Sequence, residues 1–107
     1  MILRQILGHA AFQSAKMGKV SLASGDHLYA GLNCFEPAQK HEAHIHSDQD
    51  KMYLVLEGSG EISVGGEIET VSPGDLALAP AGVPHGIANT GPARLVVLTV
   101  FAPPPKR

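Results

Sequence analysis

Short runs typical of β-strands, separated by turns rich in glycine and proline, follow one another along residues 16–101. In the run 27–36 the side chains alternate with the two-residue period of a sheet. The segment 60–71 carries Gly65 and Gly66 at its centre and has the pattern of a hairpin closed by a tight turn. No segment has the period of a helix of ordinary length. Turns at intervals of about 8 to 12 residues are typical of sandwiches and barrels, so the sequence predicts an all-β fold.

The length of 107 residues and a hydrophobic content of 44% predict one domain over residues 1–107. The N-terminal arm, residues 1–15, has apolar residues that fit either a short edge strand or one helical turn. The tail, residues 102–107, is rich in proline and cannot continue a ladder of hydrogen bonds, so we expect it to be extended.

Charge and cysteine content exclude several classes of function. The net charge is -2 and the basic residues are scattered, so nucleic acid is not an expected partner. No apolar run approaches the roughly 18 residues of a membrane span, and the first residues are too short an apolar run for a secretory signal. Cys34 is the single cysteine, which fits a reducing compartment and predicts a cytoplasmic protein. We interpret Cys34 as a small buried hydrophobe in a strand.

Three histidines form the candidate chemical centre. His44 and His46 are two residues apart, a spacing that puts both imidazoles on one face of a strand. A third, His85, follows a strand-like run and a turn that contains proline and glycine. Three imidazoles can hold a metal ion, so we predict His44, His46 and His85 as ligands. Of the remaining histidines, His9 is interpreted as an exposed side chain, His27 as a surface or dimer-contact residue, and His41 as a rim or surface residue.

The histidines fall into two motifs. The first motif reads glycine, five residues, His-x-His, three or four residues, glutamate, six residues, glycine. In this chain Ala38 stands in the first glycine slot, and Gly58 closes the motif. The second motif reads glycine, five residues, Pro-x-Gly, two residues, histidine, three residues, asparagine. Its slots are filled by Gly74, Pro80, Gly82, His85 and Asn89.

With these motifs the chain resembles the small single-domain cupins of the cupin 2 type. The resemblance implies a double-stranded β-helix, or jelly-roll barrel, of two antiparallel sheets. It also implies a homodimer, in which the N-terminal strand and the strand 94–101 could cover each other's sheet edges. We interpret Gly82 and Asn89 as residues that shape turns and loops, and Met52 and Tyr53 as pocket lining or core.

The chain departs from the cupin pattern at the carboxylate. Counting seven residues back from Gly58, the slot of the usual metal-binding glutamate holds Lys51, which cannot ligate while it is protonated. Asp50 satisfies the spacing from His46 but not the spacing to Gly58, and Gln49 is adjacent to it. Either of them could supply a fourth protein ligand. Strand parity leaves the choice open, because Lys51 and Asp50 each alternate with apolar residues. Counting from the glycine is the safer rule, since loop length varies more easily than position along a strand.

The predicted function is that of a metal-binding cupin with a three-histidine centre that acts on a small organic molecule, as a dioxygenase or an isomerase. Iron, manganese, nickel and zinc are all candidate metals, because affinity order alone does not name one. Lys51 could hold a substrate carboxylate, or pair with Asp48 or Asp50 at the surface. The alternatives are a non-catalytic module that binds or senses a small molecule, and a barrel whose histidines serve no function. Whether the protein is an enzyme is left open, because the motifs do not include the residues that line the pocket.

Overall fold

The structure is a computed structural model, and it describes residues 1–105. The predicted tail, residues 102–107, therefore lies partly outside the described residues. One short 3-10 helix, η1 (Ile6–His9), precedes the first strand. The strands are β1 (Gly18–Ser24), β2 (Tyr29–Phe35), β3 (Lys40–His44), β4 (Asp50–Glu57), β5 (Gly60–Val64), β6 (Glu67–Val71), β7 (Leu76–Ala79), β8 (His85–Ala88) and β9 (Leu95–Ala102).

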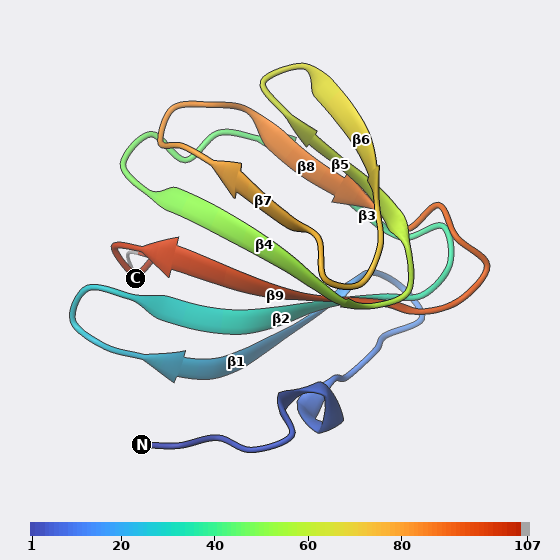
Figure 1. Ribbon diagram of the computed structural model, residues 1–107, viewed down its shortest axis with the longest axis horizontal. Coiled ribbons are helices and arrows are strands. Elements are labelled where there is room, and N and C mark those ends of the chain that lie inside the picture. Colours follow the sequence, from blue (N-terminus) through green and yellow to red (C-terminus); the bar gives the residue numbers. More distant parts are fainter. Residues whose placement is uncertain (106–107) are drawn as a thin grey trace.

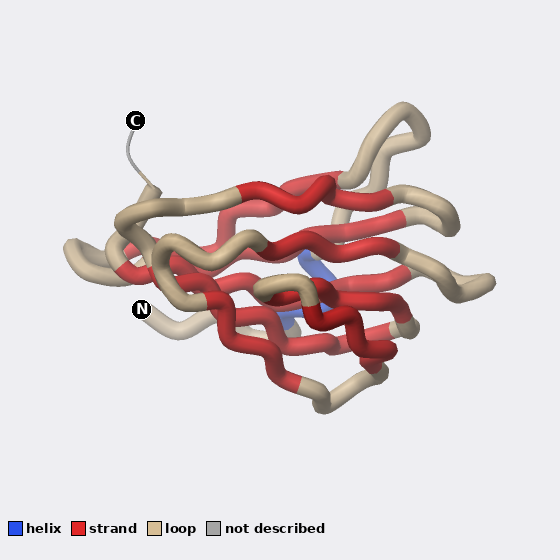
Figure 2. Tube along the Cα trace, turned by 90° about the horizontal axis from the view of Figure 1, so that it is seen from above, coloured by secondary structure: helices blue, strands red, loops and turns tan. Residues whose placement is uncertain are grey.

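The strands form two antiparallel sheets that face each other (Figure 1). The five-stranded sheet has the order β1-β2-β9-β4-β7, and the four-stranded sheet has the order β3-β8-β5-β6. In a view turned by 90°, the axes of the strands in both sheets are roughly aligned, and the loops lie at the two ends of the strands (Figure 2). The predicted all-β fold of two antiparallel sheets is confirmed. So is the hairpin β5–β6, whose turn residues Gly65 and Gly66 both have positive φ, 59° and 89°.

The main core lies between the two sheets and decides which side chains of β4 point inward. Lys51, Tyr53 and Val55 are buried, whereas Asp50 at the start of the strand is exposed. Tyr53 and Val55 pack with residues of both sheets, including Phe35 and Ile87. Burial of this apolar set fixes the register of β4, because a slip by one residue would turn every side chain over. The same register carries Lys51 into the interior.

A second, smaller cluster covers the outer face of the five-stranded sheet. Leu32, Cys34 and Val96 are buried there, with Phe12 of the N-terminal arm packed against them. The arm contains the helical turn η1 rather than an edge strand. Cys34 is fully buried in β2, as the sequence predicted. Within residues 1–105 no helix has the length and apolar character needed to cross a membrane.

Two expectations about strands are wrong. The strand 94–101 is not available to cover a sheet edge, because β9 pairs with β2 on one side and with β4 on the other (Figure 1). The dimer itself stays a prediction. The histidine pair does not lie on one strand, because β3 ends at His44 and its last paired residue is opposite His85. His46 follows in a loop that turns at Ser47 and Asp48.

Candidate metal centre

The fold brings His44, His46 and His85 together, although they come from the end of β3, the loop after it and the start of β8. His44 and His85 face each other as a cross-strand pair, which sets the distance between them. One ring nitrogen from each of the three histidines can be chosen so that all lie within 4.8 Å of one another. Three imidazoles around one ion at about 2.1 Å place their nitrogens about 3 to 3.5 Å apart, so small side-chain rotations would complete the contact.

Backbone carbonyls determine which nitrogens of the histidines are available. His44 Nδ1 lies 2.8 Å from the carbonyl oxygen of Glu42, and His85 Nδ1 lies 3.0 Å from that of Val83. A carbonyl oxygen can only accept a hydrogen bond, so each Nδ1 carries the proton and each Nε2 keeps its lone pair. Both Nε2 atoms are buried and have no hydrogen-bond partner. Two unpartnered lone pairs in one buried cluster fit a bound cation.

Burial and neighbouring groups favour the neutral form, which a metal requires, at two of the three imidazoles, those of His46 and His85. Burial lowers the pKa of His46, and the neighbouring His44 and His85 lower it further, against an opposing effect of Asp48. Burial also lowers the pKa of His85, although its hydrogen bond to the Val83 carbonyl acts in the opposite direction. The lowered pKa values of His46 and His85 therefore favour uncharged nitrogen donors at these two positions.

A cavity of about 270 Å³ opens beside His44 and His46, and it is also lined by Lys51 near the start of β4 and Phe101 near the end of β9. His85, at 1% exposure, lies behind this wall and does not line the cavity. A ligand in the cavity would therefore approach from the side of His44 and His46. The residues that line the cavity are Lys19, Tyr29, Gly31, Leu32, Asn33, His41, His44, His46, Lys51, Thr99, Phe101 and Pro105.

The motifs, the two facing sheets and the histidine cluster agree with the comparison to known families. A sequence profile described as "Cupin domain" matches residues 31–101. The chain belongs to the cupin family. This confirms the family that the motifs indicated, and with it the double-stranded β-helix.

Proteins of similar sequence and structure leave the activity open. A crystal structure of the protein TT1209 from Thermus thermophilus superposes with a TM-score of 0.94 at 33% identity, over 98% of this chain and 100% of the other. An uncharacterized protein from Aquifex aeolicus is 37% identical over 60 residues, 56% of this chain and 49% of the relative. A 5-nitrosalicylic acid 1,2-dioxygenase from Bradyrhizobium sp. is 31% identical over 64 residues, 60% of this chain and 30% of the relative. The chain thus covers half or less of these two curated relatives.

Lys51 occupies the slot where cupins usually have a metal-binding glutamate, and it points into the barrel. The side chain is 1% exposed, and it lines the cavity together with His44 and His46. Its ammonium lies 4.7 Å from the centre of the Tyr53 ring and 4.8 Å from that of Phe101. Burial, together with the ammonium of Lys19, lowers the pKa of Lys51 to about 8. The rule of counting from Gly58 therefore identified the inward position correctly.

Asp50 and Gln49, the two candidates for a fourth ligand, form hydrogen bonds elsewhere. Asp50 is exposed and accepts a hydrogen bond from the backbone N–H of Ala81 at 2.9 Å, which ties β4 to the turn before His85. Gln49 is buried, but its amide nitrogen donates to the carbonyl oxygen of Pro103. Asp50 does not belong to the histidine cluster that the structure forms within residues 1–105.

His41 lies closer to the centre than its spacing indicated. Three residues before His44, it should face the opposite side of a regular strand. The pairing of β3 with β8 shifts between His41 and His44, however, and this bulge brings the two rings to a centroid distance of 4.3 Å. His41 Nδ1 is buried without a hydrogen-bond partner. Burial and the neighbouring His44 lower the pKa of His41 to about 3. His41 is a half-buried cavity residue and no member of the three-histidine group.

The far wall of the cavity is what sequence reasoning missed. Tyr29, Asn33, Thr99 and Phe101 come from β2 and β9, two strands without any cupin motif residue. The alternating side chains of these segments predict β-strands, but they do not indicate which face of the sheet lines the cavity. Asn33 and Thr99 are the available clue, because they are polar residues within apolar strands and both are buried.

Proposed function

We propose that this cupin binds a divalent transition metal through His44, His46 and His85 and acts on a small organic molecule in the adjacent cavity. One observation carries the proposal: His44 and His85 each direct Nδ1 to a backbone carbonyl and leave a buried, unpartnered Nε2. An orphaned buried polar atom costs about 1 to 3 kcal/mol, and two of them in one cluster point to a ligand that satisfies both.

The bound metal would supply an electron-pair acceptor with open positions and, if it is iron, a site for dioxygen. The chain's own residues would do the rest. The carbonyls of Glu42 and Val83 fix the ring tautomers. Buried apolar and aromatic side chains, Tyr53 among them, limit the entry of water behind the histidines.

Dioxygenase chemistry is the finer proposal. A relative that is 31% identical over 64 residues is named as a 5-nitrosalicylic acid 1,2-dioxygenase, and three neutral histidines would leave positions for both substrate and dioxygen. The alternative is a binding module that holds its ligand without converting it. The two differ in turnover, because only an oxygenase consumes dioxygen when it meets its substrate.

The test of the metal site is elemental analysis of untagged protein purified without added metal. We expect about one metal ion per chain, and its loss in His44→Ala. The matched control is His27→Ala, because His27 is exposed and lies outside the cluster. Absence of metal in the wild type, with no uptake of iron(II), manganese(II) or zinc(II) under reducing conditions, would contradict the proposal.

The test of the finer proposal is an oxygen electrode. Iron-loaded protein is offered a panel of small aromatic and aliphatic acids that includes 5-nitrosalicylate. Consumption of dioxygen that requires both iron and His44 would support a dioxygenase. Tight binding without consumption would favour the binding module.

A further inference from the structure

We propose that Lys51, assisted by Lys19, forms a carboxylate-binding site next to the histidine cluster, and that the molecule bound in this cavity is a small organic carboxylate. The inference deepens the proposed function, on which its metal-bound form rests. It is carried by the charge of the cavity wall, by the burial of Lys51 and by the position of Lys51 beside the histidines.

The wall of the cavity carries two positive charges and no negative one among the described residues. Lys51 and Lys19 both line it, whereas no aspartate or glutamate of residues 1–105 does. The histidine side chains of the wall carry no negative charge, and a divalent metal would add further positive charge. A cavity with this balance attracts an anion, because low-dielectric walls strengthen the field inside it.

Of the two lysines, Lys51 should attract an anion more strongly, because its charge is deeply buried. A buried ammonium is costly unless an opposite charge or hydrogen-bond acceptors compensate it. The rings of Tyr53 and Phe101, at 4.7 Å and 4.8 Å, compensate part of the cost as cation–π partners. No carboxylate of the described chain offsets the effects of burial and of Lys19 on this group. A ligand carboxylate would supply the missing partner.

Asp50, the carboxylate adjacent to Lys51 in the sequence, does not take this role. Asp50 points away from the cavity and accepts a hydrogen bond from the Ala81 N–H. The next inward residue of β4 after Lys51 is Tyr53, which is not an acid. Replacing the usual glutamate by lysine therefore reverses the charge at this slot. A site that normally gives a carboxylate to the metal here offers a cation to a carboxylate on the ligand.

Size narrows the class of ligand. A volume of about 270 Å³ lies just below the roughly 300 to 1,000 Å³ of typical small-molecule pockets. Acids as small as lactate, oxalate or benzoate fit such a space. A single carboxylate between Lys51 and the histidines would direct the rest of the molecule toward the wall formed by Tyr29, Thr99 and Phe101.

The test uses acids paired with their neutral amides, which have nearly the same shape: benzoate with benzamide, lactate with lactamide, and oxalate with oxamide. Calorimetric titrations are run on zinc-loaded and on metal-free protein, and metal content is measured in each sample. We expect at least one acid to bind at least about tenfold more tightly than its amide, and Lys51→Met to weaken that acid about 10- to 100-fold without changing amide binding. Lys19→Met should weaken it less, because Lys19 is exposed.

The outcomes separate the two proposals. If every acid binds no better than its amide, or if Lys51→Met binds the acids as tightly as the wild type, the carboxylate site is refuted, whatever the metal content. If the protein takes up no metal, the proposed function fails. The carboxylate site is then decided by the same acid-to-amide comparison on the metal-free protein.

Discussion

The ammonium of Lys51 lies over the ring of Tyr53, 4.7 Å from its centre, and both side chains are fully buried. This contact keeps a positive charge inside the barrel. Other cupins usually have a metal-binding carboxylate at the same position. The aromatic ring stabilises the charge only in part, since burial still lowers the pKa of Lys51 from 10.5 to about 8. The protein thus gives up stability to keep this charge in its cavity, as functional sites often do.

The first prediction is that Lys51→Met stabilises the metal-free protein at pH 7. A pKa lowered from 10.5 to about 8 corresponds to a cost of at most about 3 kcal/mol in the free energy of unfolding. Between pH 8 and 10.5 the unfolded chain keeps a proton that the folded chain has lost, so the stability contributed by this group rises with pH. The advantage of the variant, about 1 to 3 kcal/mol at pH 7, should therefore shrink toward zero by pH 10.

Urea denaturation of both proteins at pH 7 and pH 10 measures this effect. Lys40→Met is the control, because Lys40 is exposed and forms only a surface ion pair with Glu42. Its difference from the wild type should stay within about 0.5 kcal/mol at pH 7. A Lys51→Met variant that is less stable than the wild type, or one whose advantage does not change with pH, would show that the buried ammonium is compensated in some other way.

The second prediction is that Lys51→Glu tightens metal binding. The side chain at this position shares a cavity with His44 and His46, so a carboxylate there would add a charged oxygen donor to three neutral nitrogens. We expect a dissociation constant lower by about tenfold or more, as restored ligands usually give. Competition with a chelating dye measures it. Asp50→Asn is the control and should leave the constant unchanged, because Asp50 points to Ala81. Unchanged or weaker binding by Lys51→Glu would mean that position 51 does not face the metal.

The parts of the fold that the sequence predicted well depend on local signals or on anchored positions. The hairpin turn at Gly65 and Gly66 needs positive φ angles, and two adjacent glycines in the sequence are themselves evidence for such a turn. Counting back from Gly58 identified the inward residue of β4 because Gly58 cannot shift. Its φ is 81°, and a side chain there would collide with the carbonyl of Arg94. The positive φ and the lack of space for a side chain both require glycine at this position, which fixes the end of the strand. Positions counted back from Gly58 are therefore reliable.

The parts that the sequence did not predict depend on contacts between distant strands. The bulge between His41 and His44 appears only when β3 is paired with β8. The central place of β9 results from the pairing of the whole sheet, and no short pattern within residues 94–101 names its two neighbouring strands. The far wall of the cavity has the same origin, since Tyr29 and Phe101 meet across the β2–β9 ladder. No local pattern contains such information.

The third prediction concerns Ala38, which stands in the first glycine slot of the motif. Its φ is 72°, a left-handed conformation that costs a residue with a Cβ about 1 kcal/mol. Ala38→Gly should therefore raise the free energy of unfolding by about 0.5 to 1 kcal/mol. Ala43→Gly is the control, because Ala43 lies within β3, where glycine should destabilise. Thermal unfolding checks both. A loss of stability in Ala38→Gly would show that this conformation carries no strain.

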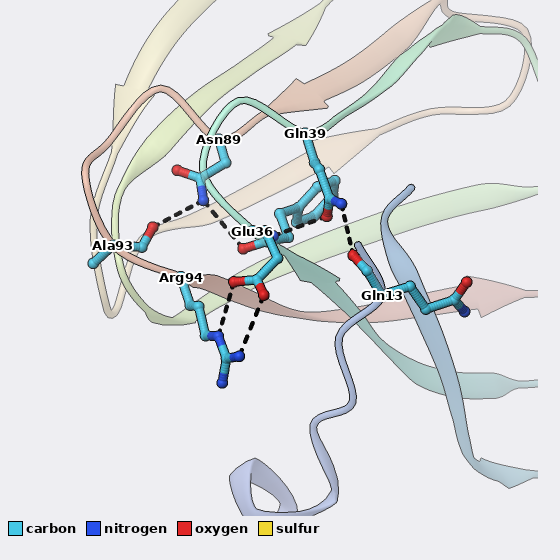
Figure 3. A network of polar contacts seen from close by, with 7 residues as sticks. Gln13, Glu36, Gln39, Asn89, Ala93 and Arg94 are labelled. Carbon is cyan, nitrogen blue, oxygen red and sulfur yellow. Dashed lines mark hydrogen bonds and ion pairs between the residues drawn. The ribbon is translucent and has the colours of Figure 1, made fainter. Parts of the chain in front are cut away.

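The fourth prediction separates the structural asparagine of the second motif from the metal site. Asn89 is buried, and its side-chain amide nitrogen donates hydrogen bonds to the carbonyls of Ala93 (Figure 3) and Phe35. Its side-chain oxygen accepts from Gly91 N–H. Asn89→Ala should lower the free energy of unfolding by about 2 to 4 kcal/mol, because these backbone groups lose buried partners. Metal content per folded chain should not change.

The control for Asn89 lies in the same network. Glu36 forms an ion pair with Arg94 at 2.9 Å on the surface (Figure 3). Glu36→Gln should cost less than about 1 kcal/mol, because water screens an exposed pair. If Asn89→Ala instead removed the metal while its stability was retained, Asn89 would have to be assigned to the site.

The fifth prediction is that metal stabilises the fold only when all three histidines are present. A ligand that binds the folded chain alone raises its stability by about 2.7 kcal/mol at a hundredfold excess over the dissociation constant, so adding EDTA should lower the melting temperature of the metal-loaded wild type by several degrees. His85→Gln, which nearly keeps the volume of a side chain that is 1% exposed, should melt at the same temperature with and without EDTA. His9→Ala should respond as the wild type does, because His9 is exposed and lies outside the cluster. A His85→Gln protein that still loses stability with EDTA would retain its metal on two histidines, and the assignment of His85 as a ligand would fail.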